Sequence, residues 1–223
     1  MDRTMGRWRI RLADAPPPAA MAMRARLFRG GAPDGDRFDA AARHLTIAGP
    51  GGLAAYARLW PQDAAGIVRG YSAAFYDLAR MAAAFPRALE VGRVAVDDPD
   101  PDLPRLMLSA LARVVEAEGA ALLYGCSSFP GTARPAALSR LAGHAAPAWG
   151  ARRAAPETMP LHGPAARAAL PPLLRLYLSL GATVSDHAVI DRDLGTVHVL
   201  AALPVAAIPA TRARLLMGPL AAA

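Results

Sequence analysis

Two charged residues of opposite sign stand in an otherwise apolar run and are the first candidates for chemistry. Glu90 and Arg93 lie within residues 88–96, which read ALEVGRVAV. An unpaired carboxylate is costly to bury, so a glutamate there needs a partner or a function. The three-residue offset puts the two side chains on opposite faces of an ideal strand, but Gly92 favours a bulge that re-aims one of them. A functional pair and an edge strand with solvated charges both stay open.

A second candidate set is acidic. Asp36 and Asp39 lie in the segment DGDRFDAAARHL. Two carboxylates at this spacing can hold an ammonium group, or they can cap a helical turn. Both interpretations stay open, with Arg24, Arg26 and Arg58 as possible partners.

Other reactive residue types fit structural roles better. Ser127 and Ser128 follow an apolar run and are expected to cap the next turn. Cys126 is expected to be a small buried residue rather than a nucleophile. The five histidines and one cysteine show no metal-ligand spacing, and the chain has neither a P-loop nor a G-x-S-x-G motif. We therefore expect no metal and no resident cofactor.

The composition is that of a globular protein large enough to bury its own core. The 223 residues are 54% hydrophobic and 19% charged. A single cysteine excludes an intramolecular disulfide, and the N-terminus lacks the apolar run of a secretory signal. No run approaches the roughly 18 apolar residues of a membrane span. These features predict a cytoplasmic protein.

The formal net charge is +7, and all 25 basic residues are arginine. A basic surface can meet nucleic acid, anionic lipid or an acidic protein. The sequence shows no helix-turn-helix pattern and no aromatic platform, so nucleic acid is disfavoured as a partner.

The elements that must position these residues follow from periodicity and punctuation. We expect a strand at 7–12, a helix at 19–29, a loop at 30–36, a hairpin of 44–48 with 53–60, and a short helix at 77–85. A strand at 88–96, a helix from Pro104 with Gly119 beyond its end, and a strand at 120–125 form a β-α-β unit with parallel strands. A helix at 172–180 and strands at 188–190 and 196–203 close the chain. The order predicts one mixed α/β domain over residues 1–223, with its core at about 7–203.

Several segments, taken in order, resemble a known family. They are MRARLF at 23–28, DRFDAAARHLTI at 36–47, YARLW at 56–60, FYDLARM at 75–81, LEVGRVAV at 89–96, LLYGCSSFPG at 122–131 and the closing block from 170 to 200. Together they resemble the ornithine N-acyltransferases of bacterial ornithine-lipid synthesis, a hemolysin-like branch of the GNAT superfamily. The chain is also similar to acyl-homoserine-lactone synthases.

The resemblance implies a fold and a reaction. The fold would be a single GNAT-like domain with a mixed, twisted sheet, splayed central strands and flanking helices. The reaction would move a (3-hydroxy)fatty acyl group from acyl carrier protein to the α-amine of ornithine, giving lyso-ornithine lipid. Acyl carrier protein would be the acidic partner of the basic surface, with the acyl thioester as co-substrate. Release of a lipid-like product implies peripheral contact with the inner membrane.

The resemblance also assigns roles to residues. It implies that Glu90 is the general base and that Arg93 orients Glu90 or holds the substrate carboxylate. The implied substrate-binding residues are Arg24, Phe28, Asp36, Asp39 and Arg58, and the two aspartates would hold the side-chain ammonium of ornithine.

The chain departs from the family pattern at three places, of which the first is a short N-terminal part before the first strand. His198 replaces an expected aspartate, which leaves a non-catalytic GNAT-like module possible. Residues 97–104 are acidic, where coenzyme A-dependent relatives carry an R-x-x-G-x-G pyrophosphate loop, so carrier protein is favoured over coenzyme A as donor. Two further functions stay open: an acyl-homoserine-lactone synthase, and an acyltransferase that acylates another amino acid such as glutamine.

Overall fold

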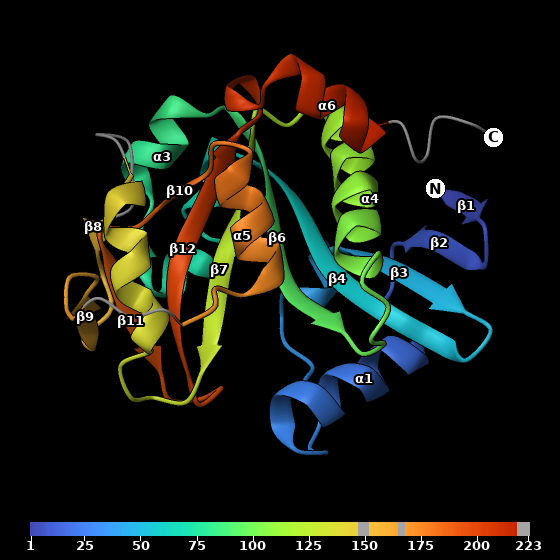
Figure 1. Ribbon diagram of the computed structural model, residues 1–223, viewed down its shortest axis with the longest axis horizontal. Helices are drawn as coiled ribbons and strands as arrows, with labels where there is room; N and C mark the ends of the chain where they lie inside the picture. The colour runs from blue at the N-terminus through green and yellow to red at the C-terminus, as the bar shows by residue number, and fades with distance from the viewer. Residues whose placement is uncertain (147–151, 165–167, 218–223) are drawn as a thin grey trace. The chain divides into compact units, whose positions relative to one another are not determined.

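The computed structural model describes residues 1–146, 152–164 and 168–217 (Figure 1). Its contacts divide the chain into two compact units. Unit 1 comprises Met1–Pro61, Val91–Gly119 and the C-terminal segment from Ala210, and unit 2 comprises Gln62–Glu90 and Ala120–Pro209. Strand β6 (Arg87–Val96) passes from unit 2 to unit 1 after Glu90. The single domain over 1–223 stays a prediction.

Unit 1 is built on an antiparallel meander. Strands β1 (Asp2–Met5), β2 (Trp8–Ala13), β3 (Arg43–Gly49) and β4 (Gly52–Asp63) pair in that order, and the second part of β6 follows β4. The β3–β4 hairpin turns at Gly52, whose φ of 106° is open to glycine and strained for other residues. The short 3₁₀ helix η1 (Asp39–Ala41) leads into β3.

Three α-helices belong to the described part of unit 1 (Figure 1). Helix α1 (Pro18–Arg29) starts with a proline in its first turn and ends at Gly30 in the left-handed conformation. Helix α4 (Leu103–Glu118) buries one apolar face and ends at Gly119, whose φ is 59°. Helix α6 (Ala210–Met217) lies beyond the core predicted at 7–203.

Unit 2 holds the mixed part of the sheet. The first part of β6 pairs in parallel with β7 (Leu122–Pro130), and β12 (Thr196–Pro204), β11 (His187–Asp191) and β9 (Thr158–Pro160) follow in antiparallel pairs. Strand β10 (Thr183–Val184) also pairs with β12. The β6–β7 register covers Ala88–Glu90 against Leu122–Tyr124. Splaying of the strands beyond this register stays a prediction.

Short elements cover the rest of unit 2. They are α2 (Ala64–Ile67), η2 (Ser72–Ala74), β5 (Tyr76–Asp77), α3 (Ala79–Ala84), η3 (Ala136–His144), β8 (Arg152–Arg153), α5 (Pro172–Ser179) and η4 (Val205–Ala207). Apolar residues of β7, β11 and β12 form its core with side chains from α3, η3 and α5.

The predicted main elements and the mixed sheet with helices are confirmed, with ends shifted by a few residues. One prediction about a turn is wrong. Ser127 and Ser128 lie inside β7, where they face Val199 and His198 of β12, because cross-strand pairing extends β7 to Pro130. Cys126 is half-buried and packs against the apolar core.

Candidate active site

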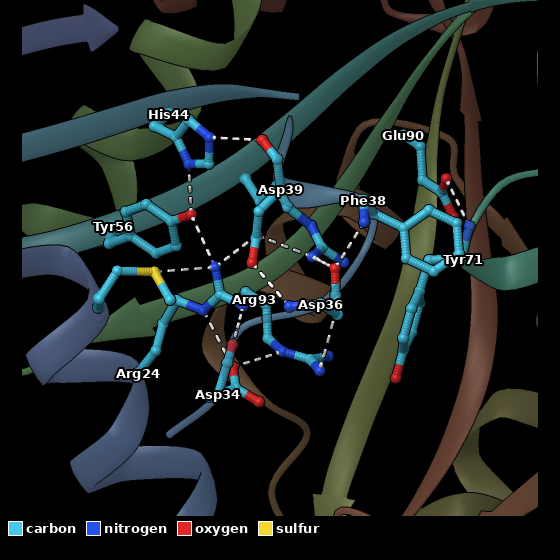
Figure 2. A network of polar contacts seen from close by, with 12 residues as sticks. Arg24, Asp34, Asp36, Phe38, Asp39, His44, Tyr56, Tyr71, Glu90 and Arg93 are labelled. Atoms are coloured by element: carbon cyan, nitrogen blue, oxygen red, sulfur yellow. Dashed lines mark hydrogen bonds and ion pairs between the residues drawn. The ribbon is translucent and has the colours of Figure 1, made fainter. Parts of the chain in front are cut away.

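A buried arginine on α1 organises the polar cluster of unit 1. The side chain of Arg24 is 0% exposed; its Nε donates to Oδ2 of Asp34 at 2.9 Å and its Nη1 to Oδ1 of Asp39 at 2.6 Å. Burial by itself would lower the pKa of Arg24, but the hydrogen bonds to Asp39 and Asp34 outweigh it and raise that pKa. Arg24 is therefore a permanent cation held by two carboxylates, as Figure 2 shows.

Asp34 is the residue that sequence reasoning missed. Its buried carboxylate accepts from Arg24, from Nε of Arg29 at 2.9 Å and from Nε of Arg93 at 2.8 Å. Burial would raise the pKa of Asp34, but its arginine partners, Arg93 foremost, lower it overall. The composition of residues 30–36 is typical of turns and predicts a simple loop. The sequence feature that could have indicated Asp34 is its D-x-D spacing with Asp36.

Asp36 and Asp39 are held by the arginines expected as their partners. Oδ1 of Asp39 accepts from Arg24 and also from Nη1 of Arg58 at 3.0 Å, and its Oδ2 accepts from the backbone N–H of Asp36. Oδ1 of Asp36 accepts from Arg58 at 2.5 Å and from the N–H of Phe38 at 2.9 Å. Arg26 instead pairs with Asp97.

Asp36 and Asp39 differ in whether a carboxylate oxygen remains available to a ligand. Both oxygens of Asp39 accept hydrogen bonds, and its side chain does not cap η1. Oδ2 of Asp36 is buried, has no hydrogen-bond partner in the described residues, and lies 3.6 Å from Nη2 of Arg93. Because this buried oxygen accepts no hydrogen bond from the described residues, it favours a ligand that can donate one.

Arg93 has the left-handed backbone conformation in β6, and the bulge expected at Gly92 stays a prediction. Its φ of 50° makes it the one non-glycine residue with positive φ in the described part of the chain, whereas Gly92 is not among the left-handed glycines. Its guanidinium is buried against Asp34 and lies 5.9 Å from the centre of the Phe28 ring. A left-handed conformation is strained for any residue other than glycine. The ion pair between Arg93 and Asp34 offsets this strain.

Glu90 lies in unit 2 with its own hydrogen-bond donors. The residue is 5% exposed, and its Oε1 accepts from the N–H of Ser72 at 2.6 Å. Its Oε2 accepts from the N–H of Tyr71 and from Nε2 of Gln62, each at 3.1 Å. The edge-strand interpretation is therefore wrong for Glu90, because β6 pairs with β7 at this residue and the carboxylate is buried.

The backbone reaches Glu90 at the start of η2. The N–H groups of Tyr71 and Ser72 have no intrahelical acceptor at this helix end, so the carboxylate satisfies them. Figure 2 shows Tyr71 beside Glu90. Gly70 comes so close that an added Cβ would lie 2.5 Å from Oε2 of Glu90 and 2.7 Å from Nε2 of Gln62. A larger residue at position 70 would therefore displace the ends of both side chains.

The hydrogen bonds leave Glu90 able to act as a proton acceptor. An ionised carboxylate offers about four acceptor sites, and the three donors at Glu90 occupy most but not all of them. All three donors are uncharged. A buried, fixed carboxylate with a spare acceptor site is suited to taking a proton from an amine.

His198, the departure from the family pattern, belongs to an aromatic cluster of unit 2. Burial lowers its pKa to about 4, although the charge of Asp191 opposes this, so the imidazole is neutral at pH 7. Its Nδ1 lies 3.2 Å from the hydroxyl of Tyr76, and the rings of Phe75 and Tyr76 pack against it. His198 is therefore a neutral group of the core, where the family resemblance implies a charged aspartate.

The described residues contain no group of three or more His, Cys, Asp or Glu arranged to hold a metal ion. Among the helices in those residues, none is both long and apolar enough to cross a membrane.

The fold is that of a GNAT domain. The acetyltransferase (GNAT) domain family matches residues 21–100, the segment that carries all seven predicted site residues. FeeM, an N-acyl amino acid synthase from uncultured soil microbes, has a similar fold, with a TM-score of 0.53 and 13% identity over 92% of this chain and 93% of that one. TofI in an apo form has a TM-score of 0.52 and 15% identity over 94% of this chain and 95% of that one.

Curated relatives identify the family more narrowly. The chain is 37% identical over 162 residues to the L-ornithine N(alpha)-acyltransferase of Rhodobacter capsulatus, which is 66% of this chain and 62% of that protein. It is 31% identical over 199 residues to the L-ornithine N(alpha)-acyltransferase of Brucella abortus, which is 77% of this chain and 70% of that protein. The chain belongs to the L-ornithine N(alpha)-acyltransferase family. It spans less than two thirds of the length of the Rhodobacter relative.

Proposed function

We propose that this protein transfers a (3-hydroxy)fatty acyl group from acyl carrier protein to the α-amine of ornithine, giving lyso-ornithine lipid. The names of the two curated relatives support the acceptor. The observation that carries the chemistry is Glu90, a buried carboxylate fixed by three uncharged donors. Direct acylation of an amine requires such a base.

The proposed reaction is aminolysis of a thioester. Glu90 takes a proton from the α-ammonium group, and the neutral amine then attacks the thioester carbonyl carbon, while a backbone N–H beside the bulge expected in β6 stabilises the resulting oxyanion. The new C–N bond forms and the C–S bond breaks. A second amine proton leaves with the pantetheine sulfur as a thiol, and Glu90 releases its own proton to solvent.

Recognition of the acceptor is assigned to the arginine-aspartate cluster. Of the two aspartates, Asp36 is the better candidate for the side-chain ammonium, because its buried Oδ2 has no hydrogen-bond partner in the described residues. Both oxygens of Asp39 are already used. Arg24 is fully buried and holds Asp34 and Asp39, so we assign it a supporting role. Phe28, Arg58 and Arg93 complete the proposed substrate-binding set.

The segment before α4 supports a carrier-protein donor. Asp97 pairs with Arg26 and Asp100 with Arg7, while carboxylates of Asp98 and Asp100 accept backbone N–H groups two residues on. A coenzyme A-binding loop offers free backbone N–H groups to the pyrophosphate. In this segment a pyrophosphate would instead lie beside carboxylates, which repel it. The net charge of +7 supports fast association with an acidic carrier protein.

One experiment tests donor and acceptor together. Purified protein is incubated with 3-hydroxyacyl carrier protein or the matching coenzyme A thioester, and products are identified by mass spectrometry. We expect N-acylornithine from the carrier-protein donor, with a far smaller kcat/KM for coenzyme A. Equal kcat/KM values for the two donors would contradict the role given to residues 97–104.

Competing acceptors distinguish this function from its competitors in the same assay. Glutamine and lysine test a different amino-acid substrate, which the fold similarity to FeeM makes the second candidate. S-adenosylmethionine tests lactone formation. A lactone product, or preference for glutamine, would replace ornithine as the acceptor. No product from any acceptor would favour the non-catalytic module.

A further inference from the structure

A buried chain of two hydrogen bonds leads from strand β7 to Glu90. The hydroxyl of Tyr124 donates to Oε1 of Gln62, and Nε2 of Gln62 donates to Oε2 of Glu90 at 3.1 Å. Tyr124 is fully buried and Gln62 is 7% exposed, so water competes little for either bond. The family resemblance assigns no role to Gln62 or Tyr124.

The tyrosine fixes which end of the Gln62 amide faces Glu90. An amide has one accepting oxygen and one donating nitrogen, so a hydroxyl that donates to the oxygen leaves the nitrogen for the carboxylate. The flipped amide would place its oxygen against Oε2 of Glu90, an acceptor against an acceptor. Burial, followed by the negative charge of Glu90, raises the pKa of Tyr124 well above its usual value. The phenol therefore keeps its proton at any pH at which acyl transfer would be measured.

The Gln62 amide that donates to Oε2 of Glu90 is uncharged, which affects how readily Glu90 can act as a base. An arginine beside Glu90 would hold the carboxylate in its ionised form and weaken its ability to take up a proton. A neutral amide fixes the oxygen in position with a smaller electrostatic effect. Gln62 is thus suited to orienting a proton acceptor, in contrast to the arginines that hold Asp34 and Asp39.

We propose that Gln62 and Tyr124 are positioning residues for the base of acyl transfer: Tyr124 sets the orientation of Gln62, and Gln62 holds the Oε2 oxygen of Glu90. The proposal rests on the proposed function of Glu90. Gln62 acts directly on Glu90, and Tyr124 acts through Gln62.

Three variants and one control test this arrangement. Gln62→Met removes the amide at similar length, Tyr124→Phe removes the hydroxyl alone, and Gln62→Glu replaces the amide by a carboxylate. Tyr177→Phe is the matched control, because Tyr177 is a buried tyrosine of unit 2 whose hydroxyl has no hydrogen-bond partner in the described residues. Each variant is compared with wild type by kcat, KM, thermal midpoint and the dependence of kcat on pH.

We expect Tyr124→Phe to lower kcat by about tenfold, the scale of one lost orienting hydrogen bond, with KM for the acyl donor unchanged. Gln62→Met lowers kcat at least as much. Gln62→Glu moves the acid limb of the pH profile upward by about one pH unit, because a second carboxylate favours protonation of the pair. Tyr177→Phe keeps the wild-type kcat and profile.

A double variant shows whether Tyr124 acts through Gln62. In the Gln62→Met background, Tyr124→Phe should cause no further loss of kcat, since the group that it orients is gone. Independent, multiplying losses would overturn the proposal, as would an unshifted profile in Gln62→Glu. If Tyr124→Phe does not fold, the Gln62→Glu profile decides. An inactive wild type would instead refute the proposed function. Failure of the positioning proposal is a different result, because it shows only in the variants of an active wild type.

Discussion

Oδ2 of Asp34 lies 2.8 Å from Nε of Arg93, and this bond ties the loop after α1 to the left-handed residue of β6. The same oxygen accepts from Arg24 at 2.9 Å. A buried carboxylate shared by two buried cations fixes both the loop and the left-handed residue Arg93. The cluster therefore has a structural role in addition to any contact with substrate.

Replacing Asp34 by asparagine should destabilise the protein by about 3–5 kcal/mol, because its buried arginine partners are left without a compensating charge. Urea unfolding measures the loss. Asp97→Asn is the control: it breaks the exposed pair with Arg26 and should cost at most about 1 kcal/mol. Equal losses in the two variants would show that the Asp34 cluster contributes no more than a surface pair.

The Asp34 contribution should also depend on pH. The arginines lower the pKa of Asp34 in the folded protein below its value in the unfolded chain. A depressed folded pKa gives stability that is present above the unfolded value, about 3.9, and is lost as pH falls through the folded value. The stability difference between wild type and Asp34→Asn should therefore shrink below about pH 4. A difference that stays constant down to acid unfolding would contradict this linkage.

Arg93→Gly should be more stable than Arg93→Ala by about 1 kcal/mol. Both variants lose the guanidinium and its bond to Asp34, but only glycine adopts a φ of 50° without strain. Chemical denaturation of the two variants measures the difference directly. An alanine variant as stable as the glycine variant would mean that the backbone at position 93 leaves the left-handed conformation once the arginine is removed.

Gly70→Ala should lower kcat by about a hundredfold, the scale of a 1 Å misplacement of a catalytic group. Its Cβ would lie within 2.7 Å of both Oε2 of Glu90 and Nε2 of Gln62, so both flexible ends must move. Gly143→Ala is the control, since a Cβ there meets nothing within 4 Å. Steady-state kinetics at saturating acyl donor checks the prediction, and wild-type kcat in Gly70→Ala would argue against Glu90 as the base.

Glu90→Gln should lower kcat by about 10²–10⁴-fold, the range of general-base catalysis. Glutamine keeps the size of the side chain but cannot accept the amine proton. The loss should become smaller as pH rises, because more of the amine is then already neutral. A kcat–pH profile of wild type and variant measures this, with the exposed Glu116→Gln as the control. Near-normal activity of Glu90→Gln at neutral pH would place the base elsewhere.

Neighbouring residues in the chain are enough to specify the local elements and the family. Helices α1 and α4 and strands β3, β4, β6 and β12 follow from apolar periodicity and from proline and glycine at their ends. The ordered motifs point to the family that the curated relatives identify. A glutamate in an apolar run is enough to single out Glu90, because burial of a carboxylate is costly wherever it occurs.

The partners that hold Glu90 and Arg93 in place are determined by the tertiary structure. Gln62 and Tyr124 are 62 positions apart, and neither has a local pattern that indicates a contact with Glu90. Asp34 has the sequence context of a turn residue, and the positive φ falls on Arg93 rather than on Gly92, because a buried ion pair outweighs local backbone preference. Ser127 and Ser128 join β7 because β12 supplies hydrogen-bond partners from about 70 residues away. These partners meet only in the folded chain, and they leave no periodic signal in the sequence.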